Sequence, residues 1–319
     1  MKIVVIVVIF FIGTMAAQNS INIPKLGTIQ IREIDGMEMV YVPAGSFEMG
    51  SSDKQLDDAM EECRKFYHSE KDCQKYIYKE KPKHKVTLDA FWIDKTEVTN
   101  AQFCRFLNTN GNQIEEGVYW FEPGAGSRNV LYGYIEKLNE KFIPKEGYEN
   151  YPVIEVSWYG ASAYCKWIGG RLPTESEWEY AARGINNFVY PWGNNFNGRF
   201  VNYRDSSFIF DNYGKDTSFN DGYPKWSPVG TYPKGASWCG ALDMSGNVHE
   251  WVNDWWSENY YAISPIKNPK GPDRGTLKIG RGGSWYDPSW HVRSSYRKGL
   301  SLSSARMHWI GFRCVIPIK

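Results

Sequence analysis

The segment Gly170-Arg-Leu-Pro-Thr-Glu-Ser-Glu-Trp-Glu-Tyr-Ala-Ala-Arg-Gly184 carries the most specific local signal in the chain. Within it, Thr174 and Glu177 stand three residues apart, just before the apolar residues Trp178, Ala181 and Ala182. This is the spacing of a capping box, in which the first and fourth side chains each bond the other residue's backbone N–H. The segment therefore predicts a helix that begins after Thr174.

Upstream of this segment, the hydrophobic pattern predicts two more helices and several strands. Ser157 can cap a helix that stops at Gly169-Gly170, and Asn100 can cap another that ends near Gly111. The runs Met39–Gly50 and Val86–Ile93 alternate or are rich in strand formers. After Gly184, Trp, Gly, Pro, Asn and Asp dominate, which is typical of loops. So long a stretch of loops needs buried aromatic side chains, disulfides or bound ions to fix its backbone.

Composition places the chain among globular proteins. It has 319 residues, 42% of them hydrophobic and 16% aromatic, and a formal net charge of +1. A charge near zero provides no overall field for nucleic acid, so we expect no nucleic-acid partner. There is no internal repeat or low-complexity linker after about residue 37. We therefore expect one domain over residues 37–319, with an N-terminal extension over 18–36 and a charged insertion at about 53–82.

The N-terminus has the layout of a secretory signal peptide over residues 1–17. Lys2 precedes an apolar run from Ile3 to Gly13, and small residues follow up to Ala17. The run is short for a membrane span, which needs about 20 residues. We expect a secreted or periplasmic protein with no integral membrane segment after cleavage. An uncleaved anchor remains the alternative.

If the protein is exported, we expect its six cysteines to form disulfides, because an oxidising compartment favours them. Cys63 and Cys73 bracket a charged stretch that reads as a surface insertion with its ends clipped together. No two cysteines form a Cys-x-x-Cys pair, which argues against a zinc knuckle or a thioredoxin-type site.

Several sequence blocks, taken in order, resemble the formylglycine-generating enzyme or sulfatase-modifying factor family. The resemblance implies an irregular, loop-rich α+β fold related to C-type lectins. Its blocks are Met39–Gly50, Asp94–Asn100, Pro152–Trp158, Gly170–Gly184, Tyr190–Gly193, Asp243–Trp251, Arg281–Trp285 and Gly311–Cys314.

The resemblance also implies how cysteines pair. Cys165 and Cys314 occupy positions that are disulfide-bonded in the family. The family's other structural disulfide is not kept, because Ala181 stands at its helix position. Cys104 with Cys239 is then a pairing expected by elimination.

Two groups of residues match calcium sites of the family, and hard cations take carboxylate and carbonyl oxygens of this kind. We therefore expect structural Ca²⁺. The alternative is that Asp243 and Asn202 only cap turns. The first group is Asp243, Gly246, Val248 and Glu250, and the second is Asn202, Tyr203, Asp221 and Tyr223.

The generating enzymes oxidise a substrate cysteine at Cu(I) held by two thiolates that follow Gly-Gly-Ser. Here Gly282-Gly-Ser284 is retained, but Asp287 takes the place of the first cysteine, and no second one follows before Arg297. An aspartate oxygen is a hard ligand and cannot replace a thiolate for Cu(I). We therefore expect no copper and no formylglycine formation by that route. His249 and Trp309 also replace a Trp and an Asn of the family, which would reshape the same cavity.

Two hypotheses for the altered cavity follow. The leading one is a calcium-stabilised ligand-binding or accessory protein for an unknown peptide, glycan or protein ligand. The alternative is a metal-dependent oxidase, hydrolase or generating-like enzyme with a His/Asp metal site. Cavity candidates for the enzyme are Ser284, Asp287, His249 and His291. Contact residues for the ligand are Trp285, Tyr286, Trp290, Arg293, Arg297 and Trp309, although these aromatic residues could instead form core under the loops.

Overall fold

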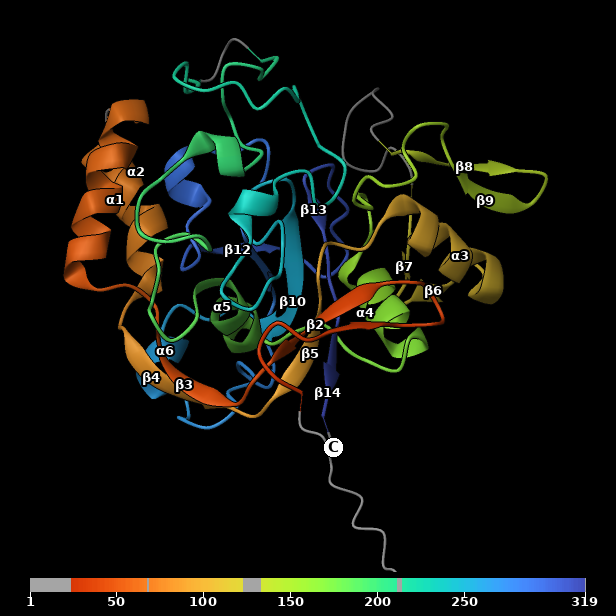
Figure 1. The fold of residues 1–319 in the computed structure, drawn as a ribbon, viewed down its shortest axis with the longest axis horizontal. Coiled ribbons are helices and arrows are strands. Elements are labelled where there is room, and N and C mark those ends of the chain that lie inside the picture. The colour runs from red at the N-terminus through yellow and green to blue at the C-terminus, as the bar shows by residue number, and fades with distance from the viewer. Residues whose placement is uncertain (1–23, 68, 123–132, 211–213, 319) are drawn as a thin grey trace, which may run out of the picture.

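The computed structural model describes residues 24–67, 69–122, 133–210 and 214–318. The expected signal peptide lies outside these residues. Within them, no helix combines the length and apolar character needed to cross a membrane. Figure 1 shows helices and sheets packed together and joined by long loops.

One four-stranded antiparallel sheet joins the two ends of the described chain. Its order is β1-β2-β5-β14, and Ile93 at its centre pairs with Val40 on one side and Val315 on the other. Because β1 pairs with β2, this part of the expected N-terminal extension belongs to the same folded unit. The strands are β1 (Ile29–Ile31), β2 (Glu38–Val42), β5 (Phe91–Asp94) and β14 (Val315–Pro317).

A second four-stranded sheet lies behind it in Figure 1. The strand that begins at His249 and the strand that leads into Gly282-Gly-Ser284 both belong to this sheet. Its order is β12-β11-β10-β13, with β10 parallel to β13 and antiparallel to β11. It consists of β10 (His249–Trp255), β11 (Lys278–Arg281), β12 (Arg297–Ser301) and β13 (Ile310–Gly311). Three two-stranded antiparallel pairs complete the strands, and the last two of them are hairpins. They are β3 (Gly45–Met49) with β4 (His84–Leu88), β6 (Ile114–Glu115) with β7 (Val118–Tyr119), and β8 (Ile135–Leu138) with β9 (Lys141–Pro144).

The three helices predicted from the sequence are present. In α5 (Glu175–Arg183) the Thr174 side chain and the Glu177 side chain each bond the other's backbone, so the predicted capping box is confirmed. Ser157 caps α4 (Trp158–Trp167) as predicted. The cap of α3 (Asn100–Asn110) is Thr99, one residue before the predicted Asn100, because Thr99 forms its own capping box. The remaining short helices are α6 (Tyr260–Ile263), η1 (Tyr78–Glu80), η2 (Gly198–Phe200), η3 (Pro233–Gly235) and η4 (Ser289–His291).

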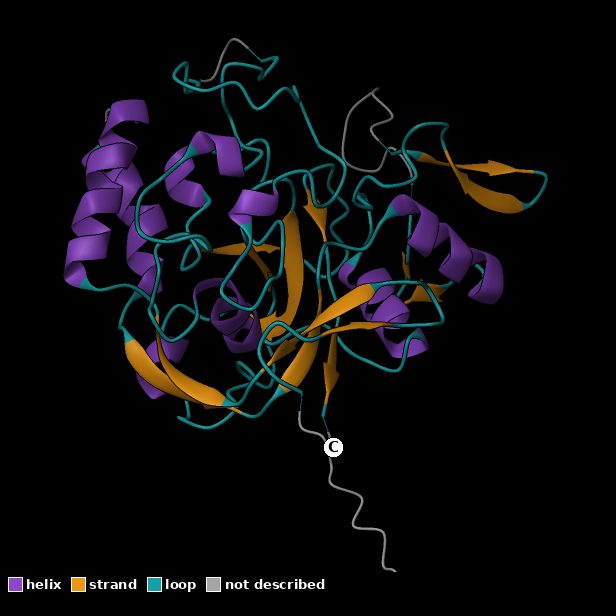
Figure 2. Ribbon diagram, in the orientation of Figure 1, coloured by secondary structure: helices purple, strands orange, loops and turns teal. Residues whose placement is uncertain are grey.

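The charged insertion is a pair of helices, α1 (Asp53–Phe66) and α2 (Glu70–Ile77). The predicted Cys63–Cys73 disulfide joins them. Figure 2 shows the pair standing side by side at one edge of the molecule. Their buried faces pack on Trp290 and Tyr296, so the insertion covers the segment that follows Asp287.

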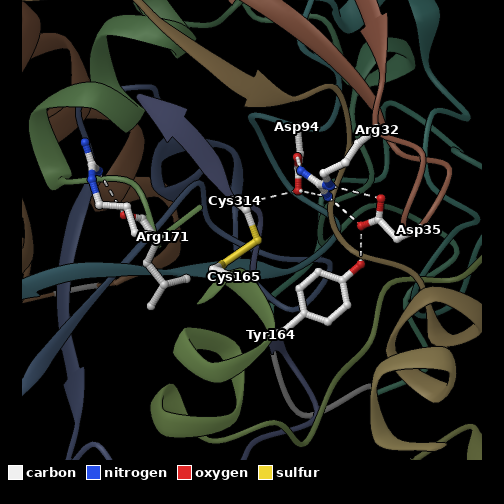
Figure 3. The surroundings of a disulfide bond; sticks show 8 residues. Arg32, Asp35, Asp94, Tyr164, Cys165, Arg171 and Cys314 are labelled. Atoms are coloured by element: carbon white, nitrogen blue, oxygen red, sulfur yellow. Dashed lines mark hydrogen bonds and ion pairs between the residues drawn. A yellow bond between two sulfur atoms is a disulfide. The ribbon is translucent and has the colours of Figure 1, made fainter. Parts of the chain in front are cut away.

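The expected Cys165–Cys314 disulfide is present and lies beside a buried polar network (Figure 3). Arg32 forms ion pairs with Asp35 and Asp94, and the Cys314 backbone N–H donates to Asp94. The Tyr164 hydroxyl, next to Cys165, donates to Asp35. The N-terminal residues that follow β1 are therefore tied by buried hydrogen bonds to α4, through Tyr164, and to the end of β5, through Asp94.

The expected pairing of Cys104 with Cys239 is wrong. Both thiols are free and buried, and they belong to different hydrophobic clusters. Cys104 packs with the aromatic side chains of α3 and α4, whereas Cys239 packs near Trp178. The expected pairing rested on the assumption that every cysteine forms a disulfide. A free buried cysteine can instead pack in the core as a small apolar side chain.

Candidate functional site

The four cavity candidates from the sequence meet in one buried hydrogen-bonded cluster around Asp287. One oxygen, Asp287 Oδ2, lies 2.6 Å from Ser284 Oγ and 2.9 Å from His249 Nε2. The other, Oδ1, lies 2.7 Å from His291 Nδ1. The Gly282–Gly283 turn after β11 positions Ser284, β10 begins with His249, and η4 ends with His291. None of the four residues is exposed by more than 5%.

The electrostatics of this cluster favour one charge state. Burial lowers the pKa of both imidazoles, that of His291 to about 3, although Asp287 acts in the opposite direction. Burial opposes the charge on Asp287, but nearby Lys298 and the two imidazoles outweigh it and hold its pKa well below the usual range. At neutral pH the cluster is therefore one carboxylate that accepts N–H bonds from two neutral imidazoles.

Each imidazole uses one nitrogen on Asp287 and leaves the other with its lone pair. Among the described residues, His249 Nδ1 and His291 Nε2 have no hydrogen-bond partner. Aromatic rings flank both imidazoles: Tyr296 stacks on His291 at 4.2 Å between centroids, and Trp309 lies 5.3 Å from His249.

This geometry limits the chemistry. Ser284 donates to Asp287 and not to an imidazole, so there is no nucleophile–base pair of the serine hydrolase kind. In the part of the chain that the structure describes, no three His, Cys, Asp or Glu side chains form a group that could hold a metal ion.

The aromatic contact residues expected from the sequence divide into two kinds. Trp285 and Trp290 are 1% and 0% exposed and belong to hydrophobic clusters, so at these positions the core alternative applies. Tyr286 and Trp309 are only partly buried and remain open to contact.

The two arginines expected to contact a ligand are internal. Arg293 forms a two-pronged ion pair with Glu80, at 2.9 and 2.5 Å, and Arg297 forms another with Glu175, at 2.8 Å on both prongs. All four side chains are at most 3% exposed. A guanidinium held in this way cannot also clamp a ligand, so this expectation is corrected. The ion pair of Arg293 could not be expected from the sequence, because its partner Glu80 lies 213 positions away.

The first group of calcium candidates lies around Asp243, which the structure places near Glu250. The Asp243 carboxylate accepts a hydrogen bond from the Gly230 backbone N–H at 2.6 Å. Glu250 pairs with Arg313 through both oxygens, each at 2.7 Å. Gly246 and Val248 lie on the intervening turn, and Gly246 adopts a φ of +75°, which favours glycine.

Glu97 belongs to the same group, although the sequence analysis did not single it out. Its side chain is fully buried, and neither carboxylate oxygen has a hydrogen-bond partner among the described residues. Burial, followed by the charges of Asp243 and Glu250, raises the pKa of Glu97 well above its usual range. A buried carboxyl beside other carboxylates needs either a proton or a cation. The sequence feature that could have pointed to Glu97 is its position within Asp94–Asn100, one of the blocks that resemble the family.

The second group of calcium candidates also comes together. Asp221 accepts backbone N–H bonds from Tyr203 at 3.3 Å and from Tyr223 at 2.8 Å. The side-chain oxygen of Asn202 is buried and has no partner among the described residues. Burial raises the pKa of Asp221 to about 7. A β-bridge between Asn202 and Gly246 connects the two groups.

Comparison with known proteins agrees with this architecture. The model of the "Sulfatase-modifying factor enzyme 1-like domain" matches residues 27–318. The chain is 33% identical over 285 residues to the serine/threonine-protein kinase Pkn1 of Chlamydia trachomatis, covering 88% of this chain but 38% of that one. It thus spans about two fifths of that relative's length.

Two mouse relatives match over most of their length. The formylglycine-generating enzyme of Mus musculus is 30% identical over 310 residues, covering 87% of this chain and 74% of that one. The inactive C-alpha-formylglycine-generating enzyme 2 of the same organism is 29% identical over 327 residues, covering 90% and 88%.

Among solved structures, PvdO from Pseudomonas aeruginosa is similar with a TM-score of 0.65 and 26% identity, covering 92% of this chain and 98% of that one. The irregular α+β fold expected from the sequence is thereby confirmed.

Proposed function

Because this chain belongs to the sulfatase-modifying factor enzyme 1-like domain family, we propose that it is an exported member that binds a ligand or assists a partner and lacks the Cu(I) chemistry of the generating enzymes. The observation that supports this most strongly is the closed cluster around Asp287. Both carboxylate oxygens already accept hydrogen bonds, from Ser284, His249 and His291. They are hard, occupied ligands where the generating enzymes have a thiolate.

The cysteines support the same proposal. Four of the six are in disulfides, and the free thiols of Cys104 and Cys239 lie in separate clusters. Burial raises the pKa of Cys104 to about 12 and also raises that of Cys239. Since the thiolate is the form that binds a soft metal, neither residue is suited to replace the missing pair.

We further propose that Ca²⁺ stabilises the loops. The residues fit the ion, because two buried oxygen-bearing side chains, Glu97 and Asn202, have oxygens without partners at the two candidate sites. Asp243 would join Glu97 at the first site, and Asp221 would join Asn202 at the second. Backbone carbonyls of the adjoining turns would complete the oxygen ligands that Ca²⁺ prefers. Burial, and then the neighbouring carboxylates, raise the pKa values of Glu97 and Asp221, and a bound cation would stabilise the charged form of both side chains.

One observation favours the second candidate function, a metal-dependent oxidase. Metal-bound histidines commonly donate their other ring N–H to a carboxylate. His249 and His291 both do this, and both leave a ring nitrogen without a partner among the described residues.

Metal analysis of the purified chain separates these functions. We expect calcium, lost on dialysis against a chelator, and no stoichiometric iron, copper or zinc. Glu97→Gln should lower the calcium content, whereas Glu115→Gln, on the β6–β7 hairpin, should not. Stoichiometric transition metal that disappears in His249→Ala or His291→Ala would instead establish the oxidase.

Export can be tested separately. N-terminal sequencing of the mature protein should begin just after Ala16 or Ala17. A mature chain that retains Met1 would show that the leader is not removed.

A further inference from the structure

A groove separates α1 of the insertion from the loops that follow α5. Its deeper part is a cavity of about 330 Å³, and a neighbouring hollow of about 490 Å³ continues it. Both volumes fall within the range of about 300–1,000 Å³ that is usual for small-ligand sites. The two parts form one groove because they share Gln55, Asp58, Val189, Asn194 and Asn195.

The wall on α1 is polar and regular. Gln55, Asp58 and Glu62 stand at spacings of three and four residues, which places them on one face of the helix. Between them is Ala59, whose small side chain leaves room for the cavity. The Gln55 side chain already accepts from the Ser52 backbone N–H and donates to the Asn187 carbonyl. This face therefore presents mainly the two carboxylates of Asp58 and Glu62 to the groove.

The opposite wall adds more amides. Asn194 and Asn195 line both parts of the groove, and Asn186 and Asn187 line the outer part. The side-chain oxygens of Asn187 and Asn194 already accept backbone N–H bonds, which leaves their NH₂ groups to donate to a ligand. An amide NH₂ group donates, whereas a carboxylate only accepts. The two walls together can satisfy a ligand with many hydroxyl groups, each of which is both a donor and an acceptor.

The inner end of the groove is aromatic. Tyr190, Phe196 and Trp290 line it, and the Trp290 indole N–H is buried without a hydrogen-bond partner among the described residues. The Trp290 ring lies 3.7 Å between centroids from His291. The inner end of the groove thus adjoins the Asp287 cluster, and the insertion forms one wall of it.

The cations along the groove already have carboxylate partners. Arg293 pairs with Glu80, and Lys54 pairs with Asp58 at 3.0 Å. Lys83 lies 4.0 Å from Glu48. With these charges compensated, the groove offers no strong attraction to a sulfated or carboxylated ligand.

We propose that this groove binds a neutral oligosaccharide. Hydroxyl groups would bond to Asp58, Glu62 and the asparagine side chains, and the apolar face of a sugar ring would pack on Phe196, the partly exposed aromatic residue at the inner end. This inference rests on the proposed ligand-binding function and gives it a place and a ligand class.

The test uses the mature full-length chain and measures binding of maltopentaose, cellopentaose, mannopentaose and chitopentaose by titration calorimetry. We expect at least one of these probes to bind. The double variant Asp58→Ala/Glu62→Ala should weaken that binding at least about tenfold, because it removes two charged hydrogen-bond acceptors. Asp57→Ala/Glu61→Ala is the matched control, since it removes the same charges from exposed neighbouring positions on α1. Its affinity should stay unchanged.

Three results would overturn the inference: none of the four probes binds, both double variants bind equally well, or a sulfated oligosaccharide or a basic peptide binds more tightly than the neutral probes. If none of the neutral probes binds and a peptide binds with an affinity insensitive to both double variants, the groove proposal is refuted while the ligand-binding function stands. Formation of aldehyde from a cysteine peptide would refute the proposed function itself, whatever the groove binds.

Discussion

Replacement of Asp287 by alanine should destabilise the fold strongly, because it removes the acceptor that three buried donors share. Those donors are Ser284 Oγ, His249 Nε2 and His291 Nδ1. A buried donor left without an acceptor costs about 1–3 kcal/mol, and costs within one network do not add in full, so we expect a loss of about 3–5 kcal/mol in the free energy of unfolding. At roughly 2–4 °C per kcal/mol for a large domain, Tm should fall by about 6–20 °C.

The assay is urea unfolding at neutral pH, followed by circular dichroism, with Tm as a second measure. Asp287→Asn should lie between wild type and Asp287→Ala, because the amide keeps one acceptor oxygen and replaces the other with a donor. Asp57→Ala, at an exposed position on α1, should match wild type. An Asp287→Ala protein as stable as wild type would refute the reasoning, since Asp287 would then be a free side chain available to a substrate or metal.

Three further predictions follow from other contacts. Glu80→Ala leaves the buried Arg293 guanidinium unpaired and should lower the free energy of unfolding, measured in urea, by about 3–5 kcal/mol. Most of this loss should be recovered in Glu80→Leu/Arg293→Met, and an effect near zero in Glu80→Ala would contradict the ion pair. Folding lowers the pKa of His291 to about 3, from about 6.5 in the unfolded chain. Between these pH values the unfolded chain binds more protons than the folded one, so the free energy of unfolding should fall as the pH drops. His291→Phe should flatten this pH dependence, and an unchanged slope would refute the assignment. Asp221 has a raised pKa of about 7, so its contribution to stability is present at low pH and is lost as the pH rises through 7. Bound Ca²⁺ should reverse this loss, so the difference between Tm in calcium and Tm in chelator should be larger at pH 8 than at pH 5. Equal differences at the two pH values would argue against calcium at Asp221.

The local parts of the fold could be predicted from the sequence because their causes are local. The capping box of Thr174 and Glu177 and the cap at Ser157 need only residues within one helical turn, and both are confirmed. The helix α1 was within reach as well. Its buried residues Leu56, Ala59, Met60 and Cys63 recur at helical spacing, but we described the segment from its sequence only as a charged surface insertion.

What escaped prediction depends on residues far apart in the chain. Arg297 meets Glu175 across 122 positions, so a charged side chain in a polar-looking segment could not be assigned to the core. The cluster around Asp287 was foreseen as a set of candidates, but its hydrogen bonds depend on how β10 and the loop after β11 pack. Glu97 was missed because what marks it is that its buried carboxylate oxygens have no hydrogen-bond partner among the described residues, and this depends on the folded structure.

The most direct test of the central claim is a turnover assay. The purified chain is supplied with Cu(I) and oxygen and incubated with a peptide that carries a sulfatase-type cysteine motif, and the peptide is then analysed by mass spectrometry. With Asp287 in the place of a thiolate and no pair of free cysteines in its cluster, we expect the cysteine to remain unconverted. Conversion of that cysteine to formylglycine over many turnovers, abolished in Asp287→Ala, would contradict the account.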